Sequence, residues 1–310
     1  MRESEVVVAQ DTPMGAVVGM TRSLEALAAL SAYVRVQAEE LPIDPLVRDV
    51  LAEVAGELLG EPEPVDAPTA AALVGVVRAF LRLAADLVDN PGRRGGWTQV
   101  DEALLQGIGR GSASVAEAIG VAETTLDGLG KRLAASGGRL LDVGTGTGWL
   151  AIALARDHPE LRVVGIDIFE PALSLARANV ADTGLGERVE LRLQDVTTLD
   201  EQGAYDAIWL ALPFLPAEIV PRALAACATA LRPGGWLLAG TFAGPNDRLT
   251  ELLMNLRTLR SGGHPWRGDE ILEMLRAAGF ADVGEIPRTW ASPTRLHTGR
   301  RPLPPPTKVA

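Results

Sequence analysis

The stretch Leu140–Ala155, LLDVGTGTGWLAIALA, constrains the fold of this 310-residue chain more than any other segment. Two leucines lead to Asp142, glycine then occupies every second position from 144 to 148, and an apolar helical pattern follows. Glycines between a strand and a helix permit a tight turn, close approach of a ligand to the backbone, and close packing of the helix. The stretch therefore predicts a βα unit whose loop lies at the carboxyl edge of a sheet, although a plain glycine-rich turn has the same pattern.

From Arg139 onward the sequence alternates between strand and helix patterns. Strands are expected over residues 139–144, 161–167, 189–195, 205–212 and 235–242, with helices over 148–157, 171–182 and 218–231. Such a βαβα series predicts a mostly parallel, doubly wound sheet with helices on both faces. Two more strands, around 281–288 and 294–300, follow a helix at 268–278 without a crossover helix between them, so one of them should be antiparallel.

The segment before this region, residues 21–135, has the apolar spacing of helices. Asp44 followed by Pro45 is a typical helix start. Residues 70–88 form an almost wholly apolar helix whose only charges, Arg78, Arg82 and Asp86, fall on one stripe. Such a helix needs partners on most of its surface, so a homodimer with this helix at or next to the interface is expected.

Composition excludes several classes of protein. The net charge of −11 argues against a nucleic-acid partner, which would need a basic footprint. The single cysteine, Cys227, rules out a disulfide framework, and no Cys/His cluster exists for a metal site. The apolar stretches are too short to span a membrane, and residues 1–10 do not form a signal peptide. A cytoplasmic protein fits all of these observations.

Three acids point to the ligand of the glycine loop. Asp167 ends the strand after the loop, where a carboxylate suits the two hydroxyls of a ribose. Asp142 stands two residues before the first glycine, where it would repel a pyrophosphate but attract an ammonium or a sulfonium. Asp195 ends the third strand, where it can accept from an adenine amino group. Together these residues describe a site for S-adenosylmethionine (SAM).

With these motifs the region from Arg139 to Arg300 resembles the class I SAM-dependent methyltransferase family, in the small-molecule type of bacterial secondary metabolism. The resemblance rests on LLDVGTGTG, VVGIDI, YDAIWLALPFLP and LRPGGWLLAG. It implies a seven-stranded sheet with an antiparallel last strand. It also implies that Asp142 lies near the methionine amino group, Asp167 on the ribose, and Ile168 against the adenine. The cofactor-binding set that we expect is Asp142, Gly144, Thr145, Gly146, Gly148, Asp167, Ile168, Asp195, Val196 and Ala211.

The resemblance also orders the chain into domains. Residues 1–20 are expected to be a flexible N-terminus and 21–135 a helical domain for substrate cover and dimerisation. Residues 136–300 would then be the SAM-binding domain, and 301–310 a disordered tail.

The fourth strand ends in Ala211, Leu212, Pro213 and Phe214, where N-methyltransferases of this family often carry Asn-Pro-Pro-Tyr. The loss of the amide argues against DNA bases and glutamine as acceptors. The expected function is therefore methylation of a small, partly apolar metabolite on oxygen, nitrogen or carbon, by direct transfer from SAM. Leu212 and Phe214 are expected in the substrate pocket, together with Trp97, Gln106 and Arg110 from the segment before the sheet. His264, in the loop of a predicted helix–turn–helix roof, is the candidate base, with a solvated loop histidine as the alternative.

Two other functions use the same fold. Because no base or substrate motif is clear, a SAM-dependent cyclase is one alternative, with SAM acting as a charge or as the substrate of an internal displacement. A non-catalytic methyltransferase-like scaffold is the other. The intact set of glycines and acids argues against the scaffold, which has no need of Asp167.

Overall fold

The computed structural model describes residues 12–61, 63–98, 100–244 and 247–304. It separates into two compact units, residues 1–85 and 86–310. The domain boundary expected between residues 135 and 136 lies inside the second unit. Most of the tail expected to be disordered, residues 305–310, lies outside the described residues.

The first unit contains α1 (Pro13–Glu39), α2 (Pro45–Leu59) and most of α3 (Ala67–Asp89). Helix α1 begins eight residues earlier than expected, because Thr12 accepts a hydrogen bond from Gly15 N and Pro13 occupies the first turn. Residues 13–20, expected to be flexible, are therefore helical. Asp44 caps α2 as predicted, accepting from Leu46 N at 2.8 Å.

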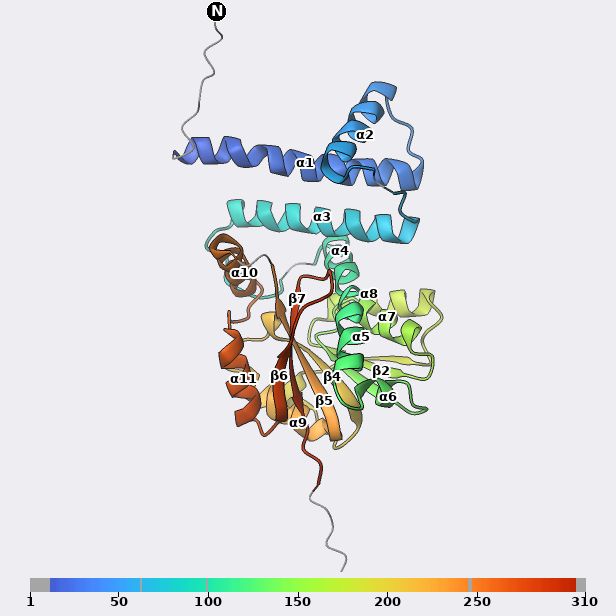
Figure 1. The fold of residues 1–310 in the computed structure, drawn as a ribbon, viewed down its shortest axis with the longest axis vertical. Helices are drawn as coiled ribbons and strands as arrows, with labels where there is room; N and C mark the ends of the chain where they lie inside the picture. Colours follow the sequence, from blue (N-terminus) through green and yellow to red (C-terminus); the bar gives the residue numbers. More distant parts are fainter. Residues whose placement is uncertain (1–11, 62, 99, 245–246, 305–310) are drawn as a thin grey trace, which may run out of the picture. The chain divides into compact units, whose positions relative to one another are not determined.

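The second unit is built on a seven-stranded sheet in the order β3-β2-β1-β4-β5-β7-β6 (Figure 1). The five parallel strands are β1 (Arg139–Val143), β2 (Arg162–Asp167), β3 (Val189–Leu193), β4 (Tyr205–Ala211) and β5 (Leu231–Phe242). The last two are β6 (Ala281–Ile286) and β7 (Thr294–Arg300), and β7 is antiparallel to both of its neighbours. The predicted fold class is thus confirmed, including the antiparallel end.

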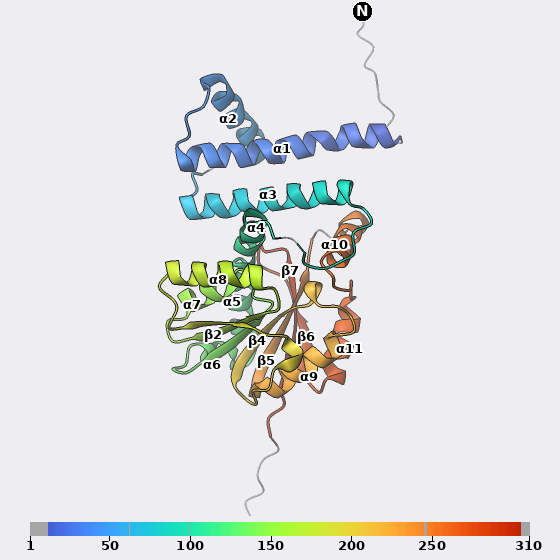
Figure 2. The ribbon, with the colours of Figure 1, turned by 180° about the vertical axis from the view of Figure 1, so that it is seen from behind.

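Helices cover both faces of this sheet, as Figures 1 and 2 show from opposite sides. Side chains alternate between two cores along each strand, so Leu140 packs with one set of helices and Leu141 with the other. The first set is α5 (Val115–Thr125), α6 (Leu129–Leu133), α7 (Trp149–Asp157) and α8 (Glu170–Asp182). The second is α9 (Val220–Ala230) and α11 (Gly268–Ala277).

Helix α4 (Glu102–Ser112) precedes the first set, and α10 (Arg248–Arg260) precedes α11. Asp101 caps α4 by accepting from Leu104 N at 2.7 Å. The spacing of Thr98 and Asp101 would also permit a capping box with Thr98 as the cap, but Asp101 is itself the cap. Ser114 precedes α5 but donates to Gly111 O instead of capping the helix.

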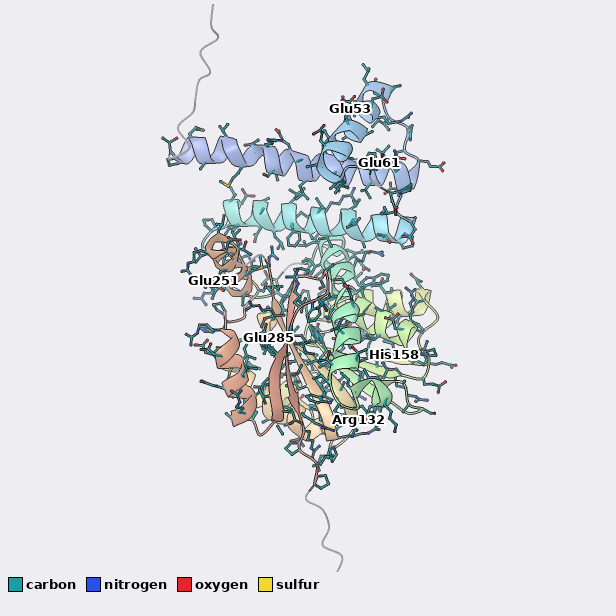
Figure 3. The ribbon with its side chains drawn as sticks, viewed as in Figure 1. Glu53, Glu61, Arg132, His158, Glu251 and Glu285 are labelled. Carbon is teal, nitrogen blue, oxygen red and sulfur yellow. The ribbon has the colours of Figure 1, made fainter. Side chains whose placement is uncertain are left out.

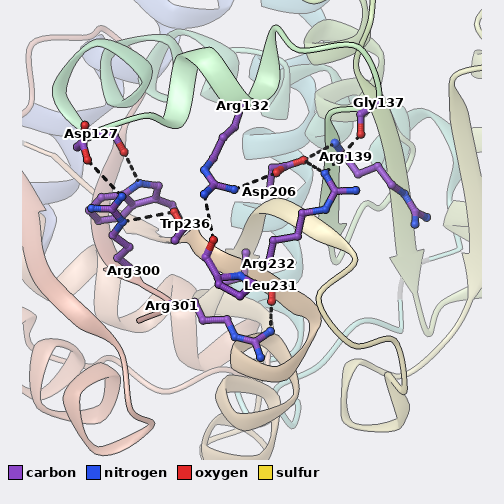
Figure 4. Close-up of polar contacts among 12 residues, drawn as sticks. Asp127, Arg132, Gly137, Arg139, Asp206, Leu231, Arg232, Trp236, Arg300 and Arg301 are labelled. Carbon is purple, nitrogen blue, oxygen red and sulfur yellow. Dashed lines mark hydrogen bonds and ion pairs between the residues drawn. The ribbon is translucent and has the colours of Figure 1, made fainter. Parts of the chain in front are cut away.

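A charged array ties the amino ends of the strands together (Figure 4). Asp206, buried at the start of β4, accepts from Arg139 N at 3.0 Å and forms ion pairs with Arg132 and Arg232. Arg132, labelled in Figure 3, also donates to Pro233 O. This array lies at the end of the sheet away from the glycine loop, so it fixes the scaffold and leaves the carboxyl edge to the site.

Candidate active site

The glycine loop lies at the carboxyl edge of the sheet, between β1 and α7. Gly144, Gly146 and Gly148 have φ values of +77°, +56° and +80°, a region that residues with a side chain rarely adopt. The loop folds back on β2, because Gly144 N and Thr145 N both donate to Ile166 O, at 2.9 and 3.1 Å. A Cβ on Gly148 would lie 3.2 Å from Ala176 Cβ, so glycine also lets α8 pack closely.

Two carboxylates lie against this loop, Asp142 buried and Asp167 half-buried. Asp142 is 1% exposed and accepts from Thr145 Oγ1 at 2.7 Å. Asp167 accepts from Gly146 N at 2.8 Å and from Phe169 N at 2.9 Å. Burial raises the pKa of Asp142 to about 7, against the opposing effect of the Thr145 hydrogen bond. Burial raises the pKa of Asp167 as well. The charge of Asp167 also raises the pKa of Asp142, so the two acids lie close enough to interact.

The remaining residues of the predicted cofactor-binding set differ in exposure and in hydrogen bonding. Ile168 is 73% exposed, an unusual state for an isoleucine directly after a buried strand, and it offers an open apolar surface. Asp195 accepts from Thr197 N and from Thr197 Oγ1, so it caps the short 3₁₀ turn η1 (Val196–Thr198). Val196 is buried, as is Ala211 at the end of β4. The ligand contacts of all these residues remain predictions.

Helix α4 is fastened to the glycine loop. Gln106 Oε1 accepts from Trp149 Nε1 at 2.9 Å, and Gln106 Nε2 donates to Asn179 Oδ1 at 2.9 Å. Asn179 also donates to Thr147 O at 2.8 Å, which closes the network on the loop. Gln106, which sequence reasoning assigned to the substrate pocket, thus has its amide oxygen and nitrogen engaged in joining α4, α7 and α8. Arg110 lies over the Trp149 ring at 4.5 Å.

The residues expected to line the pocket after β4 behave differently from one another. Leu212, in the short turn η2 (Leu212–Phe214), is 1% exposed and packs in the core with α9, so it is a core residue. Phe214 is half-buried in an aromatic cluster. Its ring lies 5.6 Å from that of Trp97 and 5.8 Å from that of Phe242.

A cavity of about 430 Å³ opens at the same carboxyl edge, beside the ends of β4 and β5. It is bounded by α10, by the loop before α11 and by β7. Its polar lining comprises Thr241, Asp247, Thr250, Glu251, Asn255, Thr258, His264 and His297, with Arg248, Arg267 and Arg295, and its aromatic lining is Phe242 and Trp266. A cavity of this size suits a small molecule.

Two histidines line this cavity. His264, the predicted base, is exposed there, with its ring 4.3 Å from that of Trp266. His297 is 1% exposed on β7 and is not among the site residues predicted from the sequence. Thr241 at the end of β5 was not singled out at all. The antiparallel register of β7 brings both of them to the cavity, and no motif in the sequence encodes that register.

The charged residues in the described ranges 12–61, 63–98, 100–244 and 247–304 include no group of three or more His, Cys, Asp or Glu side chains suited to a metal ion. None of the helices in these ranges is long and apolar enough to cross a membrane.

The sheet order, the antiparallel end, the glycine loop and its acids together define a class I SAM-dependent methyltransferase, with SAM as its cofactor. Residues 140–235 match the family model described as a methyltransferase domain. The family predicted from the motifs is therefore confirmed.

Curated relatives match about half of the chain. The chain is 33% identical over 169 residues to a ubiquinone biosynthesis O-methyltransferase of Xylella fastidiosa, a match covering 50% of this chain and 65% of that protein. It is 25% identical over 189 residues to the ubiquinone/menaquinone biosynthesis C-methyltransferase of Geobacter sulfurreducens, covering 54% and 73%. The matches thus span about two thirds of these relatives' lengths.

Solved structures share the fold over nearly the whole chain. The methyltransferase SibL in its apo form has a TM-score of 0.60 at 24% identity, covering 93% of this chain and 99% of that one. Human N-acetylserotonin methyltransferase in complex with SAM has a TM-score of 0.64 at 16% identity, covering 95% and 99%. At these identities the likeness establishes the fold.

The contact between α4 and the glycine loop leaves no room at Gly109. A Cβ there would lie 1.8 Å from Thr147 Oγ1, in a buried position. We expect Gly109→Ala to push α4 off the loop, to lower the free energy of unfolding by about 1–3 kcal/mol and to weaken binding of S-adenosylhomocysteine. Chemical denaturation and calorimetry measure the two effects.

Gly120→Ala in α5 is the matched control, because a Cβ at Gly120 meets nothing within 4 Å. That variant should be as stable as the parent or more so, since alanine favours a helix. Equal stability and affinity for Gly109→Ala and the parent would show that α4 is not fixed on the loop.

Proposed function

We propose that this protein transfers a methyl group from SAM to an oxygen atom of a small, partly apolar metabolite. The observation that carries the proposal is the cavity at the ends of β4 and β5, at the same edge of the sheet as the glycine loop, whose strand β1 pairs with β4. Phe242 and Trp266 give it apolar walls, while hydroxyl, amide and imidazole groups supply polar contacts. Acceptance by oxygen is supported by the O-methyltransferases among the similar sequences.

The residues around the loop fit SAM. It supplies an electrophilic methyl group on a sulfonium. Asp167 would accept from the ribose hydroxyls, and Ile168 would lie on the adenine face, covering the side chain that is now exposed. Asp142 would face the methionine ammonium, and Arg110 on α4 would face its carboxylate. The work of these residues is to bind and orient, and the hydrogen-bonded cover of α4 excludes water from the reacting atoms.

The acceptor would lie in the cavity, with its apolar part against Phe242 and the neighbouring Phe214. The Phe242 ring contacts the edge of the Phe214 ring, and its centroid lies 5.5 Å from the Arg257 guanidinium. Positioning of the acceptor oxygen in line with the methyl group supplies much of the rate in a displacement of this kind.

The net charge of −11 supports a small molecule as the partner, since nucleic acid would be repelled. Neither the cyclase nor the scaffold alternative gains support from the fold or from the similar proteins. A cytoplasmic setting and a role in secondary metabolism complete the proposal, and the names of the similar proteins fit the latter.

The exposed apolar surface of the first unit supports a homodimer. In α1, Met14, Val17, Met20 and Leu24 are all more than half exposed. On α2, Leu46 is 75% exposed, and on α3 Leu73 and Phe80 are exposed too. Large apolar side chains exposed in such number on one unit are typical of an interface. We place α3, including the segment 70–88, at or next to it.

The reaction is tested with methyl-labelled SAM and a panel of phenols, hydroxyquinones and matched amines. We expect the label to appear as a methyl ether on a hydroxylated acceptor, with S-adenosylhomocysteine formed in equal amount. The Asp167→Ala variant should lose about 1–3 kcal/mol of SAM affinity because the ribose hydroxyls lose their acceptor. Methylthioadenosine released from SAM alone would instead support internal displacement.

Asp142 makes cofactor binding depend on pH. The unfolded carboxyl ionises near 3.8, whereas the buried one holds its proton up to about 7. Between these values the folded protein binds more protons, so the stability of the ligand-free protein falls as pH rises. The ammonium of the ligand favours the ionised form. Hence we expect the affinity for S-adenosylhomocysteine to fall below pH 7, by up to about tenfold per pH unit.

Calorimetry at pH values from about 5.5 to about 8.5, on either side of that pKa, measures how the affinity depends on pH. Asp142→Asn is the matched variant, since it keeps the shape and an acceptor for Thr145 but does not titrate. Its affinity should be weaker and flat over this range. A flat profile for the parent protein would contradict the placement of the ammonium beside Asp142.

Sedimentation at micromolar concentration tests the dimer. We expect a species of about twice the chain mass of 32.7 kDa. Leu73→Glu on α3 should shift it to monomer while the second unit keeps its affinity for S-adenosylhomocysteine. A monomer of the parent protein under these conditions would rule the dimer out.

A further inference from the structure

A hydroxyl, an imidazole and a carboxylate stand in a row across the last three strands, beside the cavity. Thr241 Oγ1 on β5 lies 3.4 Å from His297 Nε2 on β7. His297 Nδ1 lies 3.9 Å from Glu285 Oε2 on β6. Thr241 and His297 both line the cavity, and Glu285 is labelled in Figure 3.

Strand register places the three side chains on one face of the sheet. His297 is directly opposite Glu285 on β6 and opposite Ala239 on β5. Thr241 is two residues beyond Ala239, so it is the diagonal neighbour of His297 on the same face. Leu296, the residue before His297, packs in the other core, which agrees with this alternation. The row is therefore fixed by backbone pairing.

The three side chains also lead from the cavity wall, through the buried interior, to solvent at the edge of the sheet. Thr241 is half-buried at the cavity wall, and His297 behind it is 1% exposed. Glu285, on the edge strand, has a side chain that is 38% exposed. His297 Nδ1 has no hydrogen-bond partner among the described residues. A buried ring nitrogen without a hydrogen-bond partner destabilises the fold, so its presence calls for an explanation.

We propose that His297, acting through the Thr241 hydroxyl and backed by Glu285, accepts the proton of the acceptor's hydroxyl group during methyl transfer. This inference rests on the proposed O-methylation. It assigns the proton to His297 and not to His264, which the sequence suggested. His264 is exposed in the cavity lining, and its ring is tilted by 52° against that of Trp266; among the described residues its ring has no hydrogen bond or ion pair.

The acceptor oxygen forms a bond to the methyl carbon while the bond from that carbon to sulfur breaks, and the sulfur keeps the electron pair. The acceptor's proton passes to Thr241 Oγ, whose own proton passes to His297 Nε2. The imidazolium that forms is stabilised by the negative charge of Glu285. After the methylated product leaves, the Nε2 proton returns through the Thr241 hydroxyl to water in the cavity, which restores the neutral ring with its proton on Nδ1.

The row requires one tautomer of His297. Nε2 accepts from the Thr241 hydroxyl only if the proton sits on Nδ1, facing Glu285. The charged groups that face the ring are Glu285 on β6 and Arg295 on β7 itself, and Gly268 at the start of α11 contributes no charge. Burial lowers the pKa of His297, with Glu285 opposing that shift, so the resting ring is neutral.

Nitrogen NMR of the imidazole rings tests this directly in the full-length protein saturated with S-adenosylhomocysteine. The chain has three histidines, so assignment needs only single substitutions at His158 and His264. We expect His297 to carry its proton on Nδ1. Glu285→Gln should weaken this preference, while Glu273→Gln on the exposed side of α11, the matched loss of charge, should leave it intact. A proton on Nε2 in the parent protein overturns the proposal.

Kinetics with the acceptor found for the methyl transfer provide the second readout. His297→Gln should lower kcat by roughly a hundredfold with little change in KM, the size of effect typical of a lost proton acceptor. Thr241→Val should lower kcat as well, and Thr241→Ser should restore it, because serine returns the hydroxyl. An unchanged kcat in His297→Gln, or a Thr241→Val variant as active as the parent, overturns the proposal.

These results distinguish a failure of the proposed proton transfer through Thr241 and His297 from a failure of the proposed O-methylation. If no hydroxylated acceptor is methylated, the proposed O-methylation fails. Even then, the tautomer of His297 tests the proposed arrangement of hydroxyl, imidazole and carboxylate. A proton on Nδ1 supports that arrangement, and a proton on Nε2 rules it out.

Discussion

The placement of two carboxylates under one loop, Asp142 buried and Asp167 half-buried, is the constraint on which the site depends. Asp142 and Asp167 lose much of their hydration, and they recover it through hydrogen bonds from Thr145 Oγ1 and Gly146 N. Those bonds are possible only because the glycines turn the chain in the left-handed region. Loop conformation and acid placement are thus a single arrangement, and α4 closes over it through Gln106 and Asn179.

Much of this arrangement could be predicted from the sequence because it is local. The glycine spacing, the apolar strands and the acids at strand ends lie within short windows, and period-two alternation assigns each strand residue to a face. The start of a helix is harder to predict. Thr98 and Asp101 are both suitable caps for α4, and only the path of the chain makes Asp101 the cap.

Contacts between residues far apart in the chain could not be predicted from the sequence. Gln106 looked like a pocket residue because it is polar and lies before the sheet, but its partners Trp149 and Asn179 are 43 and 73 residues away. Leu212 looked like pocket wall because it follows the strand end, yet the turn η2 directs it into the core. His297 is the clearest case, since its neighbours Thr241 and Glu285 come from strands whose pairing is not encoded in any short motif.

The raised pKa of Asp142 has a consequence for the charge of the empty and filled site. Near neutral pH the carboxyl of the ligand-free protein is substantially protonated, so at that position the buried pocket holds no uncompensated charge. With the ammonium of the cofactor beside Asp142, as proposed, the proton would leave and the ion pair that replaced it would again be neutral overall. Cofactor exchange would then also be a cation exchange, in which one proton is traded for one ammonium and the interior stays electroneutral at that position.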